Sequence, residues 1–263
     1  MKLLYVTTFN KKLYDLSGKN LIKTFLEKTK FGKMLVCYED MEFESDSDRI
    51  LSYNINQSNY FNKWLKDNEN NIPELYGGKA KNKDPRFLED KKKGQHWARF
   101  RASKYFRKIV ALNYFLEKYQ NEYDFVILID SDCILKKNID ENLINNVFKD
   151  NSSMIYFWGR YRRKKINRGP ETGFTVYSKI NNGYKFAKII CDCFGSGDFL
   201  RYEYWDDGYV IGRLICENKN KFKFKDLITT GVVTTRVMEL PSPFFDYVHH
   251  FKNLHKFDLD NIS

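Results

Sequence analysis

The chain has 263 residues, of which 42% are hydrophobic, including 22 Phe and 18 Tyr. This length and composition exclude a disordered protein and predict one large core, most simply a single domain over residues 1–263. The formal net charge is +11, which favours acidic partners such as phosphorylated substrates and also leaves peripheral contact with anionic surfaces open. Solvated lysines account for most of this excess.

The cysteines give no sign of a structural framework. They are five in number and contain no C-x-x-C pair, so neither disulfides nor a zinc site is predicted. The N-terminal apolar stretch is too short for a signal peptide, and no window approaches the roughly 20 apolar residues of a membrane span. We therefore expect reduced thiols and a cytoplasmic location.

The N-terminal segment has the pattern of a βαβ unit. Residues 2–6 are apolar and end at Thr7 and Thr8, residues 20–28 have helical apolar spacing, and residues 34–38 form a second apolar run. A right-handed parallel unit is expected. The unit carries neither G-x-G-x-x-G nor a Walker sequence, which argues against a dinucleotide site or an ATP-binding P-loop.

A polar stretch covers residues 39–93 and includes Pro73 and the pair Gly77–Gly78. It predicts an insertion of loops and short helices rather than a separate domain. Phe61 and Trp64 are expected to anchor this insertion to the core.

Residues 95–118 form the strongest predicted helix. Its apolar positions share one face and are Trp97, Phe100, Tyr105, Ile109, Leu112 and Leu116. Its basic residues lie on the other faces and are Arg99, Arg101, Lys104, Arg107 and Lys108. Because the helix leads directly into a strongly apolar strand, a few of these basic side chains can face a pocket at the end of that strand.

The most informative stretch reads Y-D-F-V-I-L-I-D-S-D-C-I-L, residues 123–135. Its apolar run Phe125–Ile129 predicts a strand buried on both faces. Asp130 and Asp132 flank Ser131 at the carboxyl end of that strand, where open α/β sheets bind ligands. Two carboxylates so close together need a cation or hydrogen-bond donors to remain ionised. A divalent metal would meet this need, and oxygen ligands favour magnesium, manganese or calcium.

This stretch resembles the DxD motif of nucleotide-sugar glycosyltransferases of the GT-A fold, in which the motif binds the metal that bridges the donor diphosphate. The resemblance implies an α/β chain with a Rossmann-like mixed β-sheet flanked by helices. It also implies Mn²⁺ or Mg²⁺ on Asp130 and Asp132, with Asp130 and Ser131 beside the nucleotide sugar. By position in that family, Thr7 and Thr8 would contact the base and ribose.

Further segments fit the same resemblance. A basic residue on the helix before the motif often reaches the donor nucleotide in GT-A enzymes, which makes Arg101 and Lys104 candidates. The loop 159–169 carries six Lys or Arg residues and is a candidate lid. The segment G-P-E-T-G-F resembles the one that faces the metal in these enzymes.

That segment implies three sugar-contacting positions, Glu171, Thr172 and Gly173. Apart from the resemblance, a glycine inside a strand marks close backbone approach or a bulge.

Two carboxylates, Asp206 and Asp207, precede an apolar helix in the segment Y-W-D-D-G-Y-V-I-G. One of them can cap the helix. The segment also resembles the acidic pair of inverting fringe-type and β-1,3-glycosyltransferases, in which one Asp is the catalytic base. The spacing to the following glycine is one residue longer here, so the base stays open between Asp207 and Asp206.

Three of the four histidines, His249, His250 and His255, cluster near the C-terminus. The segment H-F-K-N-L-H-K resembles the H-F-x-G-x-x-K segment of glycogenin-like glycosyltransferases. There the His is the third protein ligand of the metal and the Lys neutralises the leaving diphosphate. The resemblance assigns these roles to His250 and Lys256, with Asn253 in place of the glycine and His249 as an alternative ligand.

The sequence therefore predicts a metal-dependent glycosyltransferase of hexosyltransferase type. Its donor would be a nucleotide-diphosphate sugar, with UDP expected, and its acceptor a hydroxyl of a glycan, protein or small molecule. The W-D-D segment favours inversion and the histidine segment favours retention, so the stereochemistry stays open.

Two alternatives remain. A nucleotidyltransferase also combines paired acids with magnesium, but it normally has a Gly-rich basic loop after its first strand, and T-T-F-N-K-K lacks the glycines. A nucleic-acid-binding protein would need a basic stripe with exposed aromatics. Here the basic residues are dispersed and the aromatics have core spacing, so nucleic acid is not an expected partner.

Overall fold

The structure is a computed structural model, which describes residues 1–72, 102–158, 169–228, 238 and 241–251. The strands are β1 Leu3–Asn10, β2 Lys33–Glu39, β3 Ile50–Asn54, β4 Phe125–Ile129, β5 Cys133–Leu135, β6 Met154–Trp158, β7 Pro170–Ser178, β8 Phe224–Asp226 and β9 Val248–His250. The helices are α1 Lys11–Leu13, α2 Lys19–Lys28, α3 Asn59–Asp67, α6 Ala102–Lys118, α7 Glu141–Val147, α8 Gly183–Gly195 and α9 Asp207–Asn218. A π-helical turn covers Tyr14–Gly18, and 3-10 turns cover Ile55–Gln57 and Asp198–Arg201.

A seven-stranded mixed sheet forms the centre of the fold, in the order β3-β2-β1-β4-β7-β6-β8. Strands β3, β2, β1 and β4 are parallel, β7 is antiparallel to both β4 and β6, and β8 is parallel to β6. A separate antiparallel pair joins β5 to β9. The predicted α/β class, a mixed sheet flanked by helices, is confirmed.

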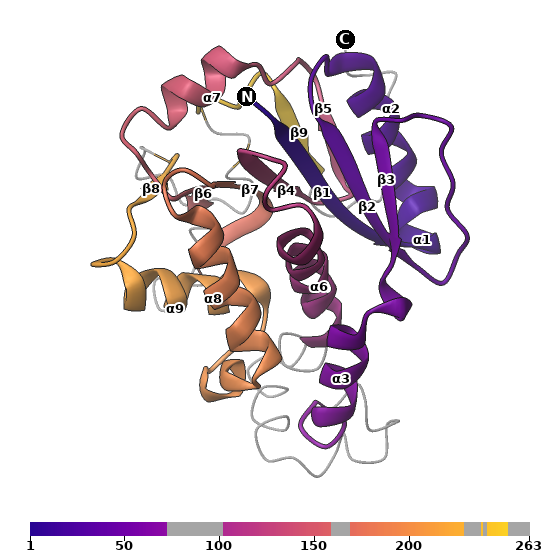
Figure 1. The fold of residues 1–263 in the computed structure, drawn as a ribbon, viewed down its shortest axis with the longest axis vertical. Coiled ribbons are helices and arrows are strands. Elements are labelled where there is room, and N and C mark those ends of the chain that lie inside the picture. The colour runs from indigo at the N-terminus through magenta and orange to yellow at the C-terminus, as the bar shows by residue number, and fades with distance from the viewer. Residues whose placement is uncertain (73–101, 159–168, 229–237, 239–240, 252–263) are drawn as a thin grey trace.

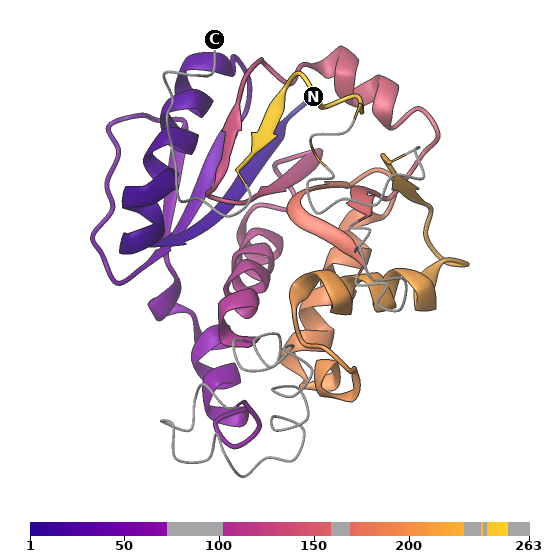
Figure 2. The ribbon, with the colours of Figure 1, turned by 180° about the vertical axis from the view of Figure 1, so that it is seen from behind.

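Two layers of helices cover the sheet (Figure 1). Helices α6, α8 and α9 pack on one face around a hydrophobic cluster that includes Phe106 and Phe194. Helices α2 and α7 and the β5–β9 pair lie on the other face, where the core includes Phe25 and Ile144. The view from behind shows the small β5–β9 pair in front of the sheet, between α2 and α7 (Figure 2).

The central strand β4 shows why its sequence is apolar without interruption. Val126 and Leu128 point into the core under α6, whereas Phe125, Ile127 and Ile129 point into the opposite core. A strand covered by helices on both faces has no solvent side, so alternation with polar residues disappears. The strand bounds predicted from the sequence match β4.

Strand β1 is longer than the sequence indicates. It continues to Asn10 and pairs with β2 through Thr7 and Thr8, which therefore lie within the strand and not in the turn after it. Hydroxyl side chains do not end a strand when its neighbour offers backbone partners, and β-branched threonine fits a strand well.

The polar stretch 39–93 contributes a strand that its sequence does not indicate. Strand β3 pairs in parallel with β2 and forms one edge of the main sheet, although the composition predicts loops and short helices there. An edge strand tolerates polar side chains because one side faces solvent. Phe61 and Trp64 are buried in the core under α6, as predicted. Within the described residues, no helix combines the length and apolarity needed to cross a membrane.

Candidate metal and catalytic site

The carboxyl end of β4 positions the two acids of the D-S-D segment. The Asp130 amide donates to the Gly173 carbonyl at 2.9 Å, and the Cys133 amide donates to the Asp130 carbonyl at 3.0 Å. This turn leaves the Asp130 and Asp132 side chains 30% and 27% exposed, respectively, while Ser131 is buried. The two carboxylates can therefore reach a ligand that Ser131 cannot reach through its side chain.

The β5–β9 pair brings a histidine from the distant end of the described chain to these acids. His250 lies directly opposite Cys133 in the ladder, and the Phe251 amide donates to the Asp132 carbonyl at 2.8 Å. The His250 Nε2 atom is 3.1 Å from Asp132 Oδ1, and the ring is buried. The expected proximity of the acids and an imidazole is present.

Alternation along β9 distinguishes the histidines. Neighbouring side chains of a strand point to opposite faces, so His249 points away from His250 and contacts the Phe251 ring, with 4.4 Å between ring centroids. His250 is thus the histidine beside the acids. His255 lies outside the described residues.

Gly173 is required by the packing of His250. A Cβ atom at position 173 would lie 2.7 Å from Cε1 and 3.1 Å from Nε2 of the His250 ring, which is closer than real Cβ contacts. The sequence predicts close backbone approach or a bulge at this glycine. The imidazole packs directly against position 173, and the pairing of β7 with β6 changes register between Glu171 and Val176.

His250 belongs to two groups of potential metal-binding atoms. In the first, ligand atoms of Asp130, Glu171 and His250 lie within 4.8 Å of one another. In the second, the same holds for Asp132, Cys133 and His250. Carboxylate oxygens with one imidazole nitrogen suit manganese, and carboxylates alone suit magnesium. The donor atoms present therefore fit the metal that the sequence resemblance implies.

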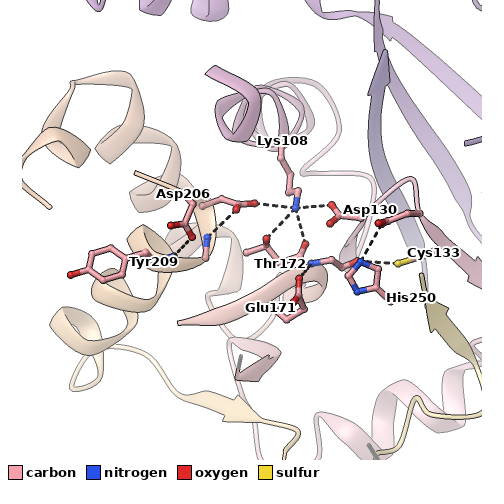
Figure 3. Close-up of polar contacts among 12 residues, drawn as sticks. Lys108, Asp130, Cys133, Glu171, Thr172, Asp206, Tyr209 and His250 are labelled. Atoms are coloured by element: carbon pink, nitrogen blue, oxygen red, sulfur yellow. Dashed lines mark hydrogen bonds and ion pairs between the residues drawn. The ribbon is translucent and has the colours of Figure 1, made fainter. Parts of the chain in front are cut away.

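Lys108 of α6 links the acids of the two halves of the site (Figure 3). Its Nζ lies 2.6 Å from Asp130 Oδ1 and 3.0 Å from Asp207 Oδ2. It also donates to the carbonyl and the Oγ1 of Thr172, at 3.0 and 3.1 Å. One buried ammonium group thus contacts three of the predicted site residues.

Burial alone would lower the pKa of Lys108, but the adjacent carboxylates of Asp130 and Asp207 reverse this and raise its pKa above the ordinary value. The lysine is therefore a permanent cation at neutral pH. It balances one of the two negative charges that surround it.

The sequence pointed to Arg101 and Lys104 on this helix and missed Lys108. Arg101 lies outside the described residues, and Lys104 is exposed. The packing of α6 over the sheet accounts for Lys108. Ten helical residues before Lys118 span about 15 Å. Five strand residues from Phe125 span about 17 Å and reach Asp130, level with Lys108.

The acidic pair before α9 divides into two roles. Asp206 is the N-cap of α9, and its Oδ1 accepts a hydrogen bond from the Tyr209 amide at 3.0 Å. Asp207 is the first residue of the helix, with Oδ1 accepting from the Gly208 amide and Oδ2 directed at Lys108. Both carboxylates are buried, but only Asp207 contacts Lys108.

The two threonines of β1 face opposite sides of the sheet. Thr8 lies two residues after Val6, whose side chain packs under α6, and Val6 is in register with Leu128 of β4. Extending this register places Thr8 level with Asp130 and on the same face. Thr7 points to the other layer, and its buried hydroxyl has no hydrogen-bond partner among the described residues.

The remaining sequence candidates fall into two groups, inside and outside the described residues. Glu171 is half-buried, and its Oε1 accepts from the Gly173 amide at 3.4 Å. Lys256 and residues 159–168 of the basic loop lie outside the described residues.

The acids beside His250 change the pKa of its imidazole. Burial alone would lower this pKa, but the hydrogen bond and charge of Asp132, together with the charge of Asp130, outweigh burial and raise it.

Comparisons with known proteins give structural similarity without a sequence match. No protein-family model matches the sequence, and a search of curated protein sequences finds no match. Among solved structures, the chain is similar to mouse xyloside xylosyltransferase 1 in its apo form, with 10% sequence identity and a TM-score of 0.47. The similarity covers 86% of this chain and 85% of that one.

Proposed function

We propose that the protein is a metal-dependent glycosyltransferase that moves a sugar from a nucleotide-diphosphate donor, with UDP the expected nucleotide, to an acceptor hydroxyl. The observation that carries the proposal is the meeting of Asp130, Asp132 and His250 at the carboxyl end of β4, with Asp207 joined to them through Lys108. These groups come from the turn after β4 and from β9, α6 and α9. The sequence resemblance assigns most of them to one reaction.

Asp130, Asp132 and His250, with Glu171 near them, are the residues that would hold Mn²⁺ or Mg²⁺. The bound ion would supply positive charge to the diphosphate that leaves the sugar. The position of the His250 ring is set by two contacts. Gly173 leaves room for the ring, and the pairing of β5 with β9 places it beside Cys133.

Asp207 is the group we assign to the acceptor side. As a general base, its carboxylate would take the proton from the acceptor hydroxyl in an inverting reaction. Lys108 holds this carboxylate in place, because its Nζ lies 3.0 Å from Asp207 Oδ2. In a retaining reaction the same carboxylate would stabilise the positive charge that develops on the sugar.

Lys108 and Thr172 are candidates to contact the donor between these two sides. The ammonium holds the Thr172 carbonyl and hydroxyl while it bridges Asp130 and Asp207. A metal ion held by Asp130 would offset the charge of that carboxylate, and the Lys108 ammonium would then interact more strongly with donor oxygens. Lys108 therefore joins the proposed donor contacts that sequence resemblance gives.

Thermal shift tests the proposal before any acceptor is known. A ligand that binds only the native state raises its melting temperature, so UDP or a UDP-sugar should stabilise the protein with manganese and not with chelator. Asp132→Ala should abolish both this shift and manganese-dependent hydrolysis of the donor. Asp192→Ala is the control, because Asp192 is exposed and forms its ion pair with Lys188 of its own helix.

Manganese-independent stabilisation by nucleotides, or full donor hydrolysis by Asp132→Ala, would contradict the assignment. Equal melting of the two aspartate variants without ligand shows that any loss belongs to the site and not to the fold.

A further inference from the structure

We propose that Asp132, Cys133 and His250 form a second metal position, which prefers a zinc-type ion and overlaps the manganese position through Asp132 and His250. The ligand atoms of these three residues lie within 4.8 Å of one another. Figure 3 shows the Cys133 sulfur and the His250 ring next to each other, on the side of the site away from Lys108.

Backbone pairing fixes the cysteine and the histidine side by side. Cys133 of β5 and His250 of β9 are direct partners in an antiparallel ladder, and such partners have Cβ atoms about 4.5–5.5 Å apart on one face. The Phe251 amide extends the ladder to the Asp132 carbonyl. The three residues therefore have a common frame that does not depend on flexible loops.

The distances suit a small tetrahedral ion. With zinc bond lengths of about 2.0–2.3 Å, neighbouring ligand atoms in a tetrahedral site are roughly 3.3–3.8 Å apart. The His250 Nε2 and Asp132 Oδ1 atoms are already 3.1 Å apart. Cys133 Sγ donates weakly to the Gly173 carbonyl at 3.5 Å and lies within 4.8 Å of the ligand atoms of Asp132 and His250.

The two positions differ in ligand chemistry. Asp130, Glu171 and His250 offer two oxygens and a nitrogen, a set that suits manganese. Asp132, Cys133 and His250 offer oxygen, sulfur and nitrogen, and a thiolate strongly favours zinc over manganese. Binding would release the Cys133 proton to solvent, because the ligand is the thiolate. A search of the sequence for paired cysteines cannot find this metal position, because the position contains one cysteine, one aspartate and one histidine.

Sharing Asp132 and His250 makes the two positions mutually exclusive. An imidazole nitrogen that binds zinc beside Cys133 is withdrawn from manganese beside Asp130. We therefore expect zinc to inhibit the enzyme at low concentration; this consequence rests on the proposed function, whereas zinc binding itself does not.

Cobalt is the probe for the thiolate, because cobalt bound to sulfur gives a charge-transfer band in the near ultraviolet that oxygen and nitrogen ligands do not give. The full chain should bind one Co²⁺ with this band, and Zn²⁺ should displace it. Cys133→Ser should lose the band and raise the zinc dissociation constant about tenfold or more, as loss of a ligand does. Cys216→Ser is the control, because Cys216 is an exposed thiol and its variant should keep the band.

A band that survives in Cys133→Ser, or a wild-type protein that shows no band, overturns the second position. Cys133 is buried, so a serine variant that fails to fold is replaced by Cys133→Ala and His250→Gln. Both should lose tight zinc binding while melting near the wild type in chelator, and tight zinc binding by either one also overturns the position. If zinc binds through Cys133 but no sugar transfer is found, the metal position stands and the proposed function fails.

Discussion

Replacing Lys108 by methionine should destabilise the protein measurably, because the change leaves two acidic side chains without their cation. Lys108 is 16% exposed, Asp207 is 7% exposed and Asp130 is 30% exposed. Removing one partner of a buried ion pair costs about 3–5 kcal/mol. The partial exposure of Asp130 places the expected cost near the lower end, about 3 kcal/mol.

For a chain of this size, 1 kcal/mol corresponds to a melting shift of about 2–4 °C, so Lys108→Met should melt roughly 6–12 °C below the wild type in chelator. Differential scanning calorimetry measures the shift. Manganese should recover part of it, because an ion on Asp130 replaces the lost charge. Lys104→Met, one helical turn earlier and exposed, is the matched control and should change stability by no more than about 0.5 kcal/mol.

A double variant isolates the contact. Adding Asp207→Asn to Lys108→Met removes one uncompensated charge, so the double variant should be more stable than the sum of the single effects by about 1 kcal/mol or more. If Lys108→Met melts with the Lys104→Met control, the bridge between Asp130 and Asp207 contributes nothing and the reasoning about the site charge is wrong.

Other substitutions test the rest of the site. Asp207→Asn should reduce transfer at least about 100-fold, with the melting temperature little changed. Asp206→Ala should instead cost about 1–2 kcal/mol of stability through the lost N-cap and retain more activity. The reverse pattern would make Asp206 the base. Gly173→Ala should displace the His250 ring, since the added methyl would lie 2.7 Å from it, and cost about 1–3 kcal/mol as overpacking. Its manganese affinity, measured by calorimetry, should fall, and wild-type affinity would show that His250 is not a ligand.

Local patterns determined a large part of the fold. The uninterrupted apolar run Phe125–Ile129 predicts a strand covered on both faces, and β4 has the predicted bounds. The D-S-D acids lie at its carboxyl end because they come directly after Ile129 in the chain. The edge strand β3 escaped prediction because half of an edge strand faces solvent and carries no clear apolar alternation.

The site depended on contacts between distant segments. His250 could be suspected from its motif, but its place beside Asp132 results from the pairing of β9 with β5, more than 100 residues earlier in the chain. The role of Lys108 was hidden among five basic residues on one helix, because composition does not say which turn of a helix lies level with the end of a strand.

The sequence by itself thus determined the elements with strong apolar patterns, such as β4, and which residue types carry charge, since these depend on near neighbours in the chain. Only the tertiary structure decided that Lys108 joins Asp130 to Asp207, that Asp206 caps a helix while Asp207 faces the site, and that Cys133 lies opposite His250. Those facts depend on strand register and helix packing, and long-range packing is set by the whole core rather than by any one segment.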